Sequence, residues 1–389
     1  MRQIRLVPFG WHTRYLLRNY LRYTFIVVAG LLLVALTIDL SSQLAGILAA
    51  RPQAGGLETA ALLAWYLLLR SVDILARNLP LAIYLAVMWC EFSHTLSSER
   101  VAVGVAGRSP LQCLIPGLVF GFVLGCVQLT LDLWLRPAAV MTQASEHLGN
   151  YGDRFDRRPT ETVRWIRNGN DLISARLDFG PPASLRDVTL YRLEADLQPR
   201  EVTIARAAFP ADQPSTWEFM NGYYWEWTAP PPPATAGQAR ADARPSPPRA
   251  FARRELALDV DPLWLANWGI DGKYLPQRVL TTLAANPSPG FPKSDYQTWV
   301  QVRYARGLFV LGMALLGASL GQMSLTRLPR LYGLLAMLLA GYSCHVAQKA
   351  LEILGELDAV PPLVAGWSVP VALMLGAAAV QLKAHRTVG

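Results

Sequence analysis

The chain has 389 residues, of which 52% are hydrophobic and only 16% are charged, and its formal net charge is +8. Soluble globular proteins average about 25% charged residues, so this composition argues against an ordinary soluble protein and indicates a membrane protein. The positive charge does not require a nucleic-acid partner, because cytoplasmic loop arginines explain much of it.

Six apolar runs are long enough, at about 20 residues each, to cross a bilayer as helices. In chain order they cover Tyr20–Leu44, Ala61–Phe92, Leu111–Leu135, Gly307–Met323, Leu331–Leu351 and Leu363–Leu382. A polar stretch separates the third run from the fourth. The sequence therefore predicts three transmembrane helices within residues 1–135, an inserted domain over residues 136–302, and three more helices within residues 303–389.

The orientation follows from Lys and Arg in the short loops, which stay on the cytoplasmic side. The basic residues of the N-terminal segment, the second-to-third loop, the fourth-to-fifth loop and the tail are Arg2, Arg5, Arg14, Arg18, Arg22, Arg100, Arg108, Arg327, Arg330, Lys383 and Arg386. The loop after the fifth run carries only acidic charges. This distribution predicts cytoplasmic N- and C-termini and an inserted domain on the outer side. The first run has no small-residue cleavage site and is expected to be retained.

Residues 94–110 form a polar island between the second and third apolar runs. Glu99 and Arg100 stand at its start, small residues follow, and Ser109-Pro110 ends it. This pattern predicts a short helix at the bilayer surface instead of a simple turn. A membrane protein that keeps such a helix at its cytoplasmic surface usually has a partner that docks there.

The inserted domain changes to short β-prone runs from about Thr160, separated by turn signals such as Asn168-Gly169-Asn170 and Asn221-Gly222. Short alternating strands at this spacing are typical of an all-β sandwich or jelly roll. Its tryptophans, including Trp165 and Trp217, are expected to pack in the core. Residues 229–250 are rich in Pro, Ala and Arg and predict a flexible insertion, because they cannot bury a core.

No catalytic motif is present in the sequence: there is no P-loop, no nucleophile elbow and no His-Glu-x-x-His pattern. The five histidines are scattered over different segments, and the cysteines have no metal-ligand spacing. We expect the chain to have no catalytic residues, no metal and no cofactor. The four cysteines are expected to be structural thiols in or beside the apolar runs: Cys90, Cys113, Cys126 and Cys344.

Charged residues inside apolar runs are costly, so they indicate function by default. Asp39 lies near the outer end of the first run, and Arg70, Asp73 and Arg77 follow at one-turn spacing in the second. Two interpretations stay open. These residues belong to a helical extension above the membrane, or they line the mouth of a cavity that meets an anionic lipid head group.

Several segments, in the right order and topology, resemble the LptF/LptG lipopolysaccharide-export permease family over nearly the whole chain. The resemblance is carried by Arg14–Arg22, Leu79–Ala86, Ser97–Ser109, Trp165–Gly169, Leu185–Tyr191 and Val360–Pro370. The end of the first run and the Trp-x-x-Pro in the sixth favour an LptG-like over an LptF-like member. This resemblance implies six transmembrane helices arranged 3+3 and an inserted periplasmic β-jelly-roll domain.

The resemblance also implies a function and partners. It makes the chain one permease subunit of an inner-membrane ABC transporter that passes lipopolysaccharide to a periplasmic β-jelly-roll bridge. The implied partners are a paralogous LptF/LptG subunit, an LptB-type ATPase dimer that hydrolyses ATP, and LptC/LptA-type periplasmic proteins. In this family the cytoplasmic helix, here residues 94–110, couples to the ATPase, which assigns that role to Glu99 with Arg100 and Arg108 as neighbours.

If the chain is such a permease, the charged residues expected to line the lipid cavity are Asp39, Arg70, Asp73, Arg77 and Arg303. The chain departs from the family pattern at Asp39, where many LptG-like members carry a basic residue. Gly307 replaces a proline near the start of the fourth run, and residues 229–250 are an extra segment.

Two other classes of function remain as alternatives. One is a non-transporting membrane scaffold whose β domain binds an envelope partner, which would not need a cytoplasmic docking helix. The other is a membrane enzyme that modifies lipids, against which the scattered histidines argue. Co-purification of an ATPase would separate a transporter from a scaffold, and lipid turnover by the isolated chain would indicate the enzyme.

Overall fold

The computed structural model describes residues 10–50, 55–156, 162–180, 182–194, 198–213, 215–228, 244–285, 294–323 and 330–388. It separates into two compact units. The helical unit comprises residues 1–156, 271–281 and 294–389, and the β unit comprises residues 157–270 and 282–293.

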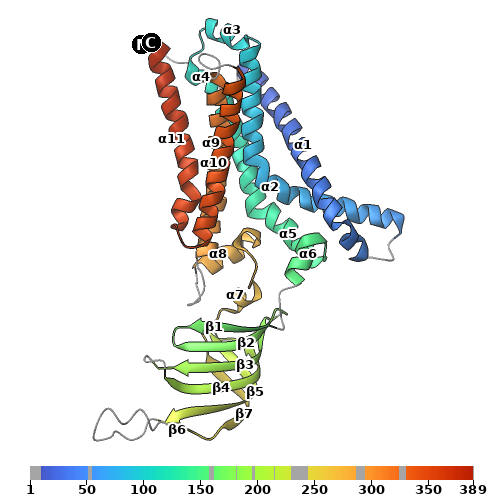
Figure 1. The fold of residues 1–389 in the computed structure, drawn as a ribbon, viewed down its shortest axis with the longest axis vertical. Coiled ribbons are helices and arrows are strands. Elements are labelled where there is room, and N and C mark those ends of the chain that lie inside the picture. Colours follow the sequence, from blue (N-terminus) through green and yellow to red (C-terminus); the bar gives the residue numbers. More distant parts are fainter. Residues whose placement is uncertain are drawn as a thin grey trace, which may run out of the picture. The chain divides into compact units, whose positions relative to one another are not determined.

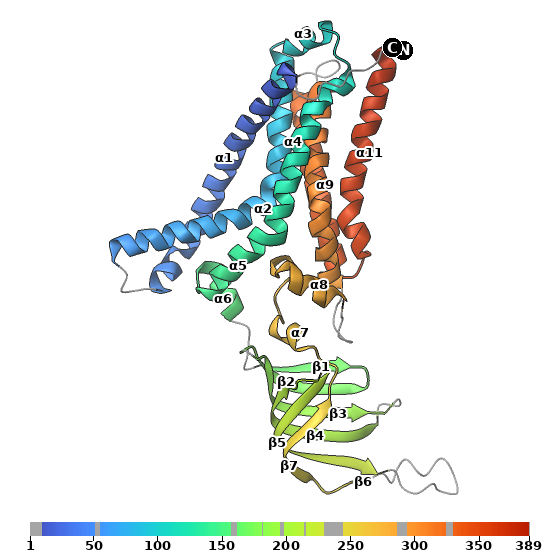
Figure 2. The same cartoon turned by 180° about the vertical axis from the view of Figure 1, so that it is seen from behind.

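The helical unit contains the long helices of Figures 1 and 2. Its elements are α1 (Trp11–Ala50), α2 (Gly56–Leu96), α3 (Glu99–Val105), α4 (Pro110–Thr130), the π-helical segment η1 (Leu131–Leu135), α5 (Arg136–Ser145), α6 (Gly149–Asp156), the 3-10 turn η2 (Gly272–Tyr274), α9 (Ser294–Met323), α10 (Arg330–Glu356) and α11 (Pro362–Val388). Helix α8 (Gln277–Ala285) crosses the division between the two units.

Six helices of the described residues are long and apolar enough to cross a membrane, which confirms the predicted spans. Helix α9 lies centrally, packing against α2, α4, α10 and α11. Helix α4 approaches it closely, because a Cβ atom on Gly125 would lie 2.6 Å from the carbonyl oxygen of Gly307. Glycine at position 307, where the family pattern has proline, therefore permits a tight crossing of α4 and α9.

Helices α1 and α2 have 40 and 41 residues. At 1.5 Å per residue each is about 60 Å long, roughly twice the thickness of a bilayer's hydrocarbon core. Figures 1 and 2 show that the first half of α2 turns away from the helical bundle. Pro80 lies inside α2 and accounts for a bend, because it removes a backbone hydrogen bond and clashes with the preceding turn.

The helical unit covers more of the chain than the predicted segments 1–135 and 303–389. Helix α4 continues through η1 into α5 and α6 up to Asp156, and residues 271–281 and 294–302 also belong to this unit. Arg136 does not mark the end of the helical unit. It begins α5, and its side chain is buried in an ion pair with Asp73.

The β unit is built on one antiparallel sheet of seven strands. These are β1 (Val163–Asn168), β2 (Asp171–Asp178), β3 (Ser184–Leu193), β4 (Pro199–Pro210), β5 (Thr216–Thr228), β6 (Arg244–Pro245) and β7 (Arg249–Ala257), with α7 (Pro262–Ala266) after them. Strands β1 to β5 pair in chain order, and β5 also pairs with both β6 and β7. The structure thus confirms a helical membrane protein with an inserted β domain.

Alternation along the strands buries one face of the sheet, as the sequence predicts. The buried core includes Ile166, Ile173, Leu185, Val188, Leu190, Val202, Trp217 and Phe219. The core prediction is confirmed for Trp217 but wrong for Trp165, which is 59% exposed and stacks on Tyr191. Hairpin β1–β2 closes with Gly169 at a φ of +57°, which glycine adopts without strain.

The predicted insertion at residues 229–250 falls partly outside the described residues, which resume at Arg244. Its last residues form β6 and begin β7, so the tail of this segment belongs to the sheet. Among the described residues, β6 and β7 both pair with β5, at the end of the sheet opposite to β1.

Candidate functional site

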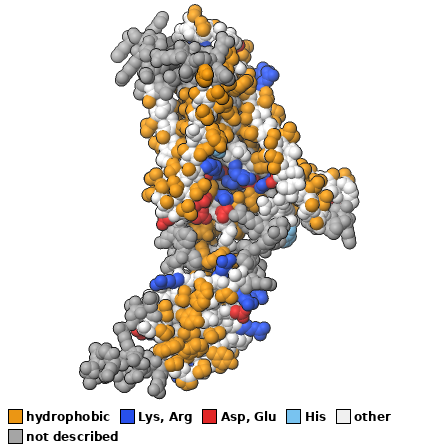
Figure 3. Space-filling view, viewed as in Figure 1, with side chains coloured by type: hydrophobic (Ala, Val, Ile, Leu, Met, Phe, Trp, Pro, Cys, Tyr) orange, Lys and Arg blue, Asp and Glu red, His pale blue; other side chains and the backbone are white. Residues whose placement is uncertain are grey.

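A cavity of about 620 Å³ lies between α1, α2 and α10 in the helical unit. Figure 3 shows Lys and Arg side chains gathered beside acidic ones on an otherwise largely apolar face of this unit. The charged groups that line the cavity are Asp39, Arg70, Arg77 and Lys349, joined by His345. Three cations and one carboxylate among the lining residues give the cavity wall a net positive charge, and Ile38, which is 65% exposed, also lines it.

Asp39 takes part in this lining as a counter-ion. Its carboxylate pairs with Arg70 at 2.6 Å and accepts a hydrogen bond of 2.5 Å from the hydroxyl of Tyr66. It therefore positions the Arg70 guanidinium and ties α1 to α2. The second half of α1 and the first half of α2 are therefore held together by an ion pair as well as by apolar packing.

Asp73 lies behind the cavity and has no exposed surface. Its carboxylate accepts from Arg70 (3.0 Å) and Arg77 (2.5 Å), and from the buried Arg136 (2.9 Å) on α5. The hydroxyl of Tyr151 also donates to it at 2.7 Å. Burial and the Asp73 charge raise the pKa of Tyr151, which keeps this phenol protonated as a donor.

A second buried carboxylate group continues the charged chain. Asp132, positioned by the π-helical η1, lies 3.8 Å from Arg136 and 2.8 Å from Arg306 on α9. Arg306 also pairs with Glu352 of α10 at 3.3 Å, and Glu352 pairs with Lys349 at 2.8 Å. Local π-helical geometry often marks functional positions. Here η1 carries the residue that joins the α2 charges to those of α10.

The structure brings together Asp39, Arg70, Asp73 and Arg77, but it separates Arg303 from them. The Arg303 guanidinium is 1% exposed and donates to the carbonyls of Gly272 and Leu275 at 3.1 and 2.7 Å. It also donates to the side chain of Gln277 at 2.8 Å. Arg303 therefore holds η2 and the residues that follow it in place, and it is not among the residues that line the cavity.

Sequence analysis missed Lys349 and His345 as lining residues. The signal was present, since Lys349 and Glu352 stand three residues apart at the end of the fifth apolar run. The same rule that singled out the charges of the second run applies to this pair. Asp132 was missed although it is a charge inside the third apolar run, and Arg306, which precedes the fourth run, is revealed by its contacts with Asp132 and Glu352.

The predicted cytoplasmic helix is present as α3, and none of its residues is buried. Glu99 begins it, with one carboxylate oxygen 2.6 Å from His94 Nδ1 and 3.4 Å from the Tyr15 hydroxyl, which donates to it. Two large apolar side chains one turn apart, Val101 and Val105, are 66% and 84% exposed. Helix α3 therefore offers an exposed carboxylate and an apolar pair on a fixed support.

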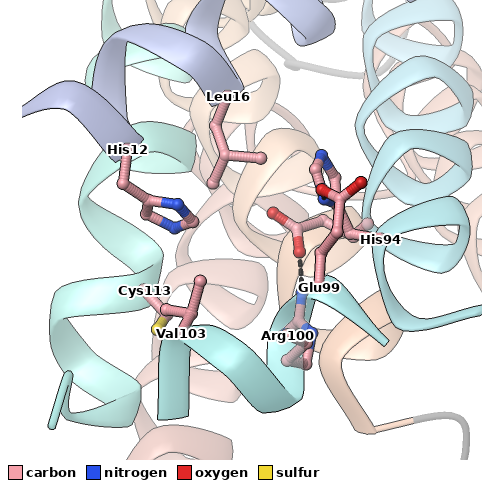
Figure 4. A pocket seen from close by; sticks show the side chains of 8 residues that line it. His12, Leu16, His94, Glu99, Arg100, Val103 and Cys113 are labelled. Atoms are coloured by element: carbon pink, nitrogen blue, oxygen red, sulfur yellow. Dashed lines mark hydrogen bonds and ion pairs between the residues drawn. The ribbon is translucent and has the colours of Figure 1, made fainter. Parts of the chain in front are cut away.

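Arg100 points into the protein, away from the surface that α3 exposes. It pairs with the buried Glu91 of α2, which also accepts a hydrogen bond from the buried Tyr20 of α1. Figure 4 shows this ion pair beside a pocket of about 40 Å³ that Leu16 and Cys113 also line. Burial lowers the pKa of Arg100 from its usual high value.

Arg108 lies beyond the end of α3 and is half-buried. The two arginines predicted beside Glu99 are therefore placed differently: Arg108 follows the end of α3, and Arg100 lies beneath the helix. No group of three or more His, Cys, Asp or Glu side chains within the described part of the chain is placed to hold a metal ion.

Among the described residues, six helices long and apolar enough to cross a membrane and an inserted antiparallel β domain define a multi-pass membrane protein. The family described as lipopolysaccharide export system permease LptF/LptG matches residues 14–383, nearly the whole chain, so the chain belongs to that family. It is a permease component of lipopolysaccharide export in the inner membrane and not an enzyme. The match covers LptF and LptG together, and a comparison with curated proteins gives no match.

Proposed function

We propose that this chain is one of two permease subunits of an ABC transporter that extracts lipopolysaccharide from the inner membrane. The observation that carries the proposal is the cavity between α1, α2 and α10, lined by Arg70, Arg77 and Lys349. Guanidinium and ammonium groups bind lipid phosphates through charge-assisted hydrogen bonds. The apolar surface around the cavity receives the acyl chains of the same molecule.

Energy for extraction comes from an LptB-type ATPase dimer that docks on α3. In this docking Glu99 supplies the charged contact, and Val101 and Val105 supply an apolar anchor, because both valines are exposed on a helix that buries nothing. Arg108 is a neighbour of this surface. Since basic residues concentrate in the loops on the α3 side, this side is the cytoplasm and both termini lie there.

The β unit lies in the periplasm and hands the lipid to LptC/LptA-type jelly-roll proteins. Two apolar pairs on its surface support a lipid path: Ile204 with its cross-strand neighbour Tyr223, and Trp165 with Tyr191. Within the described residues β1 pairs with β2 alone, so its other edge is a place where a strand from a partner could add. A paralogous LptF/LptG subunit completes the transporter and the lipid cavity.

Photocrosslinking in intact cells tests lipid capture directly. A photoreactive residue at Ile38 or Asn78, both in the cavity lining, is expected to form adducts with lipopolysaccharide. The same residue at Phe122, which is 63% exposed on α4 and absent from the lining, is the control and is expected to give far fewer. Equal labelling at all three positions, or none at Ile38 and Asn78, would contradict the proposal.

The competing function is a membrane scaffold without transport, for which no docking helix is needed. The exposed Val101 and Val105 on α3 favour the transporter. Co-purification of the permease with the ATPase, lost on Glu99→Lys and kept on Glu58→Lys at the N-terminus of α2, is the expected outcome. An ATPase complex that survives Glu99→Lys unchanged would remove the coupling role from this residue.

A further inference from the structure

Glu352 is a buried carboxylate that two cations share. Its side chain is 4% exposed, and it contacts Lys349 at 2.8 Å and Arg306 at 3.3 Å. Lys349 lines the cavity and has a 37% exposed side chain, whereas the Arg306 side chain is 5% exposed and lines no part of it. One partner of Glu352 is therefore available to a ligand and the other is not.

Arg306 has a second carboxylate of its own. One of its terminal nitrogens donates to Asp132 at 2.8 Å, and the guanidinium lies 5.1 Å from the ring centre of Trp299. These contacts keep Arg306 in place whether or not Lys349 stays against Glu352. The cation behind the cavity is thus fixed independently of the cation in front of it.

An anion that enters the cavity competes with Glu352 for Lys349. If Lys349 were the only partner of Glu352, its capture by the ligand would leave a buried carboxylate uncompensated, which is strongly unfavourable. Because Arg306 remains at the same carboxylate, Glu352 keeps a cationic partner after Lys349 has moved to the ligand, although Arg306 is shared with Asp132. The cost of ligand binding is correspondingly lower.

We propose that Arg306 is a positioning residue that holds a reserve positive charge behind the cavity and thereby releases Lys349 for an anionic lipid head group. This role rests on the proposed lipid-binding function of the cavity. The arrangement recurs on the opposite wall, where Asp73 contacts the lining residues Arg70 and Arg77 and also the buried Arg136, which would stay at Asp73 if the other two turned toward a ligand. Both walls thus offer lining cations whose carboxylates have a second, buried partner.

The test is a titration of the purified permease–ATPase complex with lipopolysaccharide, with a photocrosslinking residue at Asn78. Arg306→Gln is expected to raise the lipopolysaccharide concentration for half-maximal adduct by about tenfold, because Glu352 then retains Lys349. Adding Glu352→Gln to Arg306→Gln is expected to restore capture to near the wild-type level, because Lys349 is free again. Arg306→Lys keeps the reserve charge and serves as the matched control.

If the role of Arg306 were purely structural, the double variant would capture lipopolysaccharide more weakly than Arg306→Gln, because a second change in the buried network would weaken capture further. Unchanged capture in Arg306→Gln, or no recovery in the double variant, would overturn the proposal. Glu352→Gln alone covers the case in which Arg306→Gln does not fold: it is expected to tighten capture, and weaker capture would count against the proposal. Absence of adducts in the wild-type complex would instead refute lipid binding in this cavity.

Discussion

Asp73 is the residue on which most of the buried charge converges. It is fully buried and contacts Arg70, Arg77 and Arg136 as well as the Tyr151 hydroxyl. Buried ion pairs add little stability compared with apolar packing, yet removal of one member leaves the others uncompensated. Removal of the Asp73 charge would therefore leave Arg70, Arg77 and Arg136 without their shared carboxylate.

Asp73→Asn is expected to destabilise the helical unit by about 3–5 kcal/mol, because three arginines lose their shared counter-ion. The measurement is the unfolding temperature of the purified protein in detergent. Asp39→Asn is the control, with a smaller expected loss, since Asp39 is 13% exposed and pairs with only one arginine. Equal losses in the two variants would show that the burial of Asp73 adds nothing.

At the exposed surface of α3, the apolar pair gives a second residue-scale prediction. Val101→Asp together with Val105→Asp is expected to weaken ATPase binding at least tenfold, about 1.4 kcal/mol, with little effect on folding because both side chains are exposed. Binding of the purified ATPase to the permease measures it. Val103→Ala, on the half-buried side of α3, is the matched control and should leave binding nearly unchanged.

Among the elements, α3 is connected to the long helices through Arg100. The chain Arg100–Glu91–Tyr20 links α3, α2 and α1 by side-chain contacts beneath the exposed surface. We expect this chain of contacts to pass a movement of α3 to the two helices that also line the cavity. Glu99 contacts the same helices through His94 of α2 and Tyr15 of α1, so Arg100 is the link that can be removed without changing the exposed docking surface.

Arg100→Met is expected to retain the ATPase but to lower ATP-driven lipopolysaccharide release severalfold, because the link to Glu91 is lost. Release of lipid from proteoliposomes to a periplasmic acceptor, compared with co-purification of the ATPase, gives the two readouts. Arg108→Met, outside this chain of contacts, is the comparison. A parallel loss of docking and release in Arg100→Met would return Arg100 to the docking surface.

The crossing of α4 and α9 depends on glycine at position 125. Gly125→Ala is expected to cost about 1–3 kcal/mol, because its Cβ would meet the Gly307 backbone. Gly30→Ala in α1, where no atom lies within 4 Å of the added Cβ, is expected to be neutral or to stabilise the helix by up to about 1 kcal/mol. Thermal unfolding of both variants checks the contrast.

The elements themselves were largely predictable from sequence. Apolar length identified the six spans, and alternation with turn signals identified most strands. The cavity was only half predictable, since Asp39, Arg70, Asp73 and Arg77 stand out as charges in apolar runs. Asp132 is likewise a charge inside the third apolar run and could have been singled out, whereas Arg306 precedes the fourth run and only its contacts with Asp132 and Glu352 reveal its role.

Trp165 and Arg303 show the limits of residue type as a guide. Tryptophan is usually buried, but Trp165 lies on the open face of β1 and stacks on Tyr191. An arginine near the start of a membrane helix suggests a ligand contact, but Arg303 donates to the backbone carbonyls of Gly272 in η2 and of Leu275 directly after it. In both cases the outcome depends on which face of the element the residue occupies.

For the whole molecule, the features of the helical unit divide into a docking helix and a cavity, both connected to α1 and α2. In the proposed function, Glu99 and the two exposed valines of α3 are the surface for an ATPase, and the charged cavity is the site for the lipid. Membership of the lipopolysaccharide-export permease family gives these two features a common purpose. We propose that ATP hydrolysis by an ATPase docked on α3 drives the lipid out of the cavity.

The most direct test follows lipopolysaccharide adducts at Asn78 in the full transporter before and after ATP is added. Adducts are expected to form without nucleotide and to fall sharply during ATP hydrolysis, while adducts at the β unit, probed at Tyr223, rise. The fall should be absent in Glu99→Lys. Adducts at Asn78 that persist unchanged during ATP hydrolysis would contradict the account.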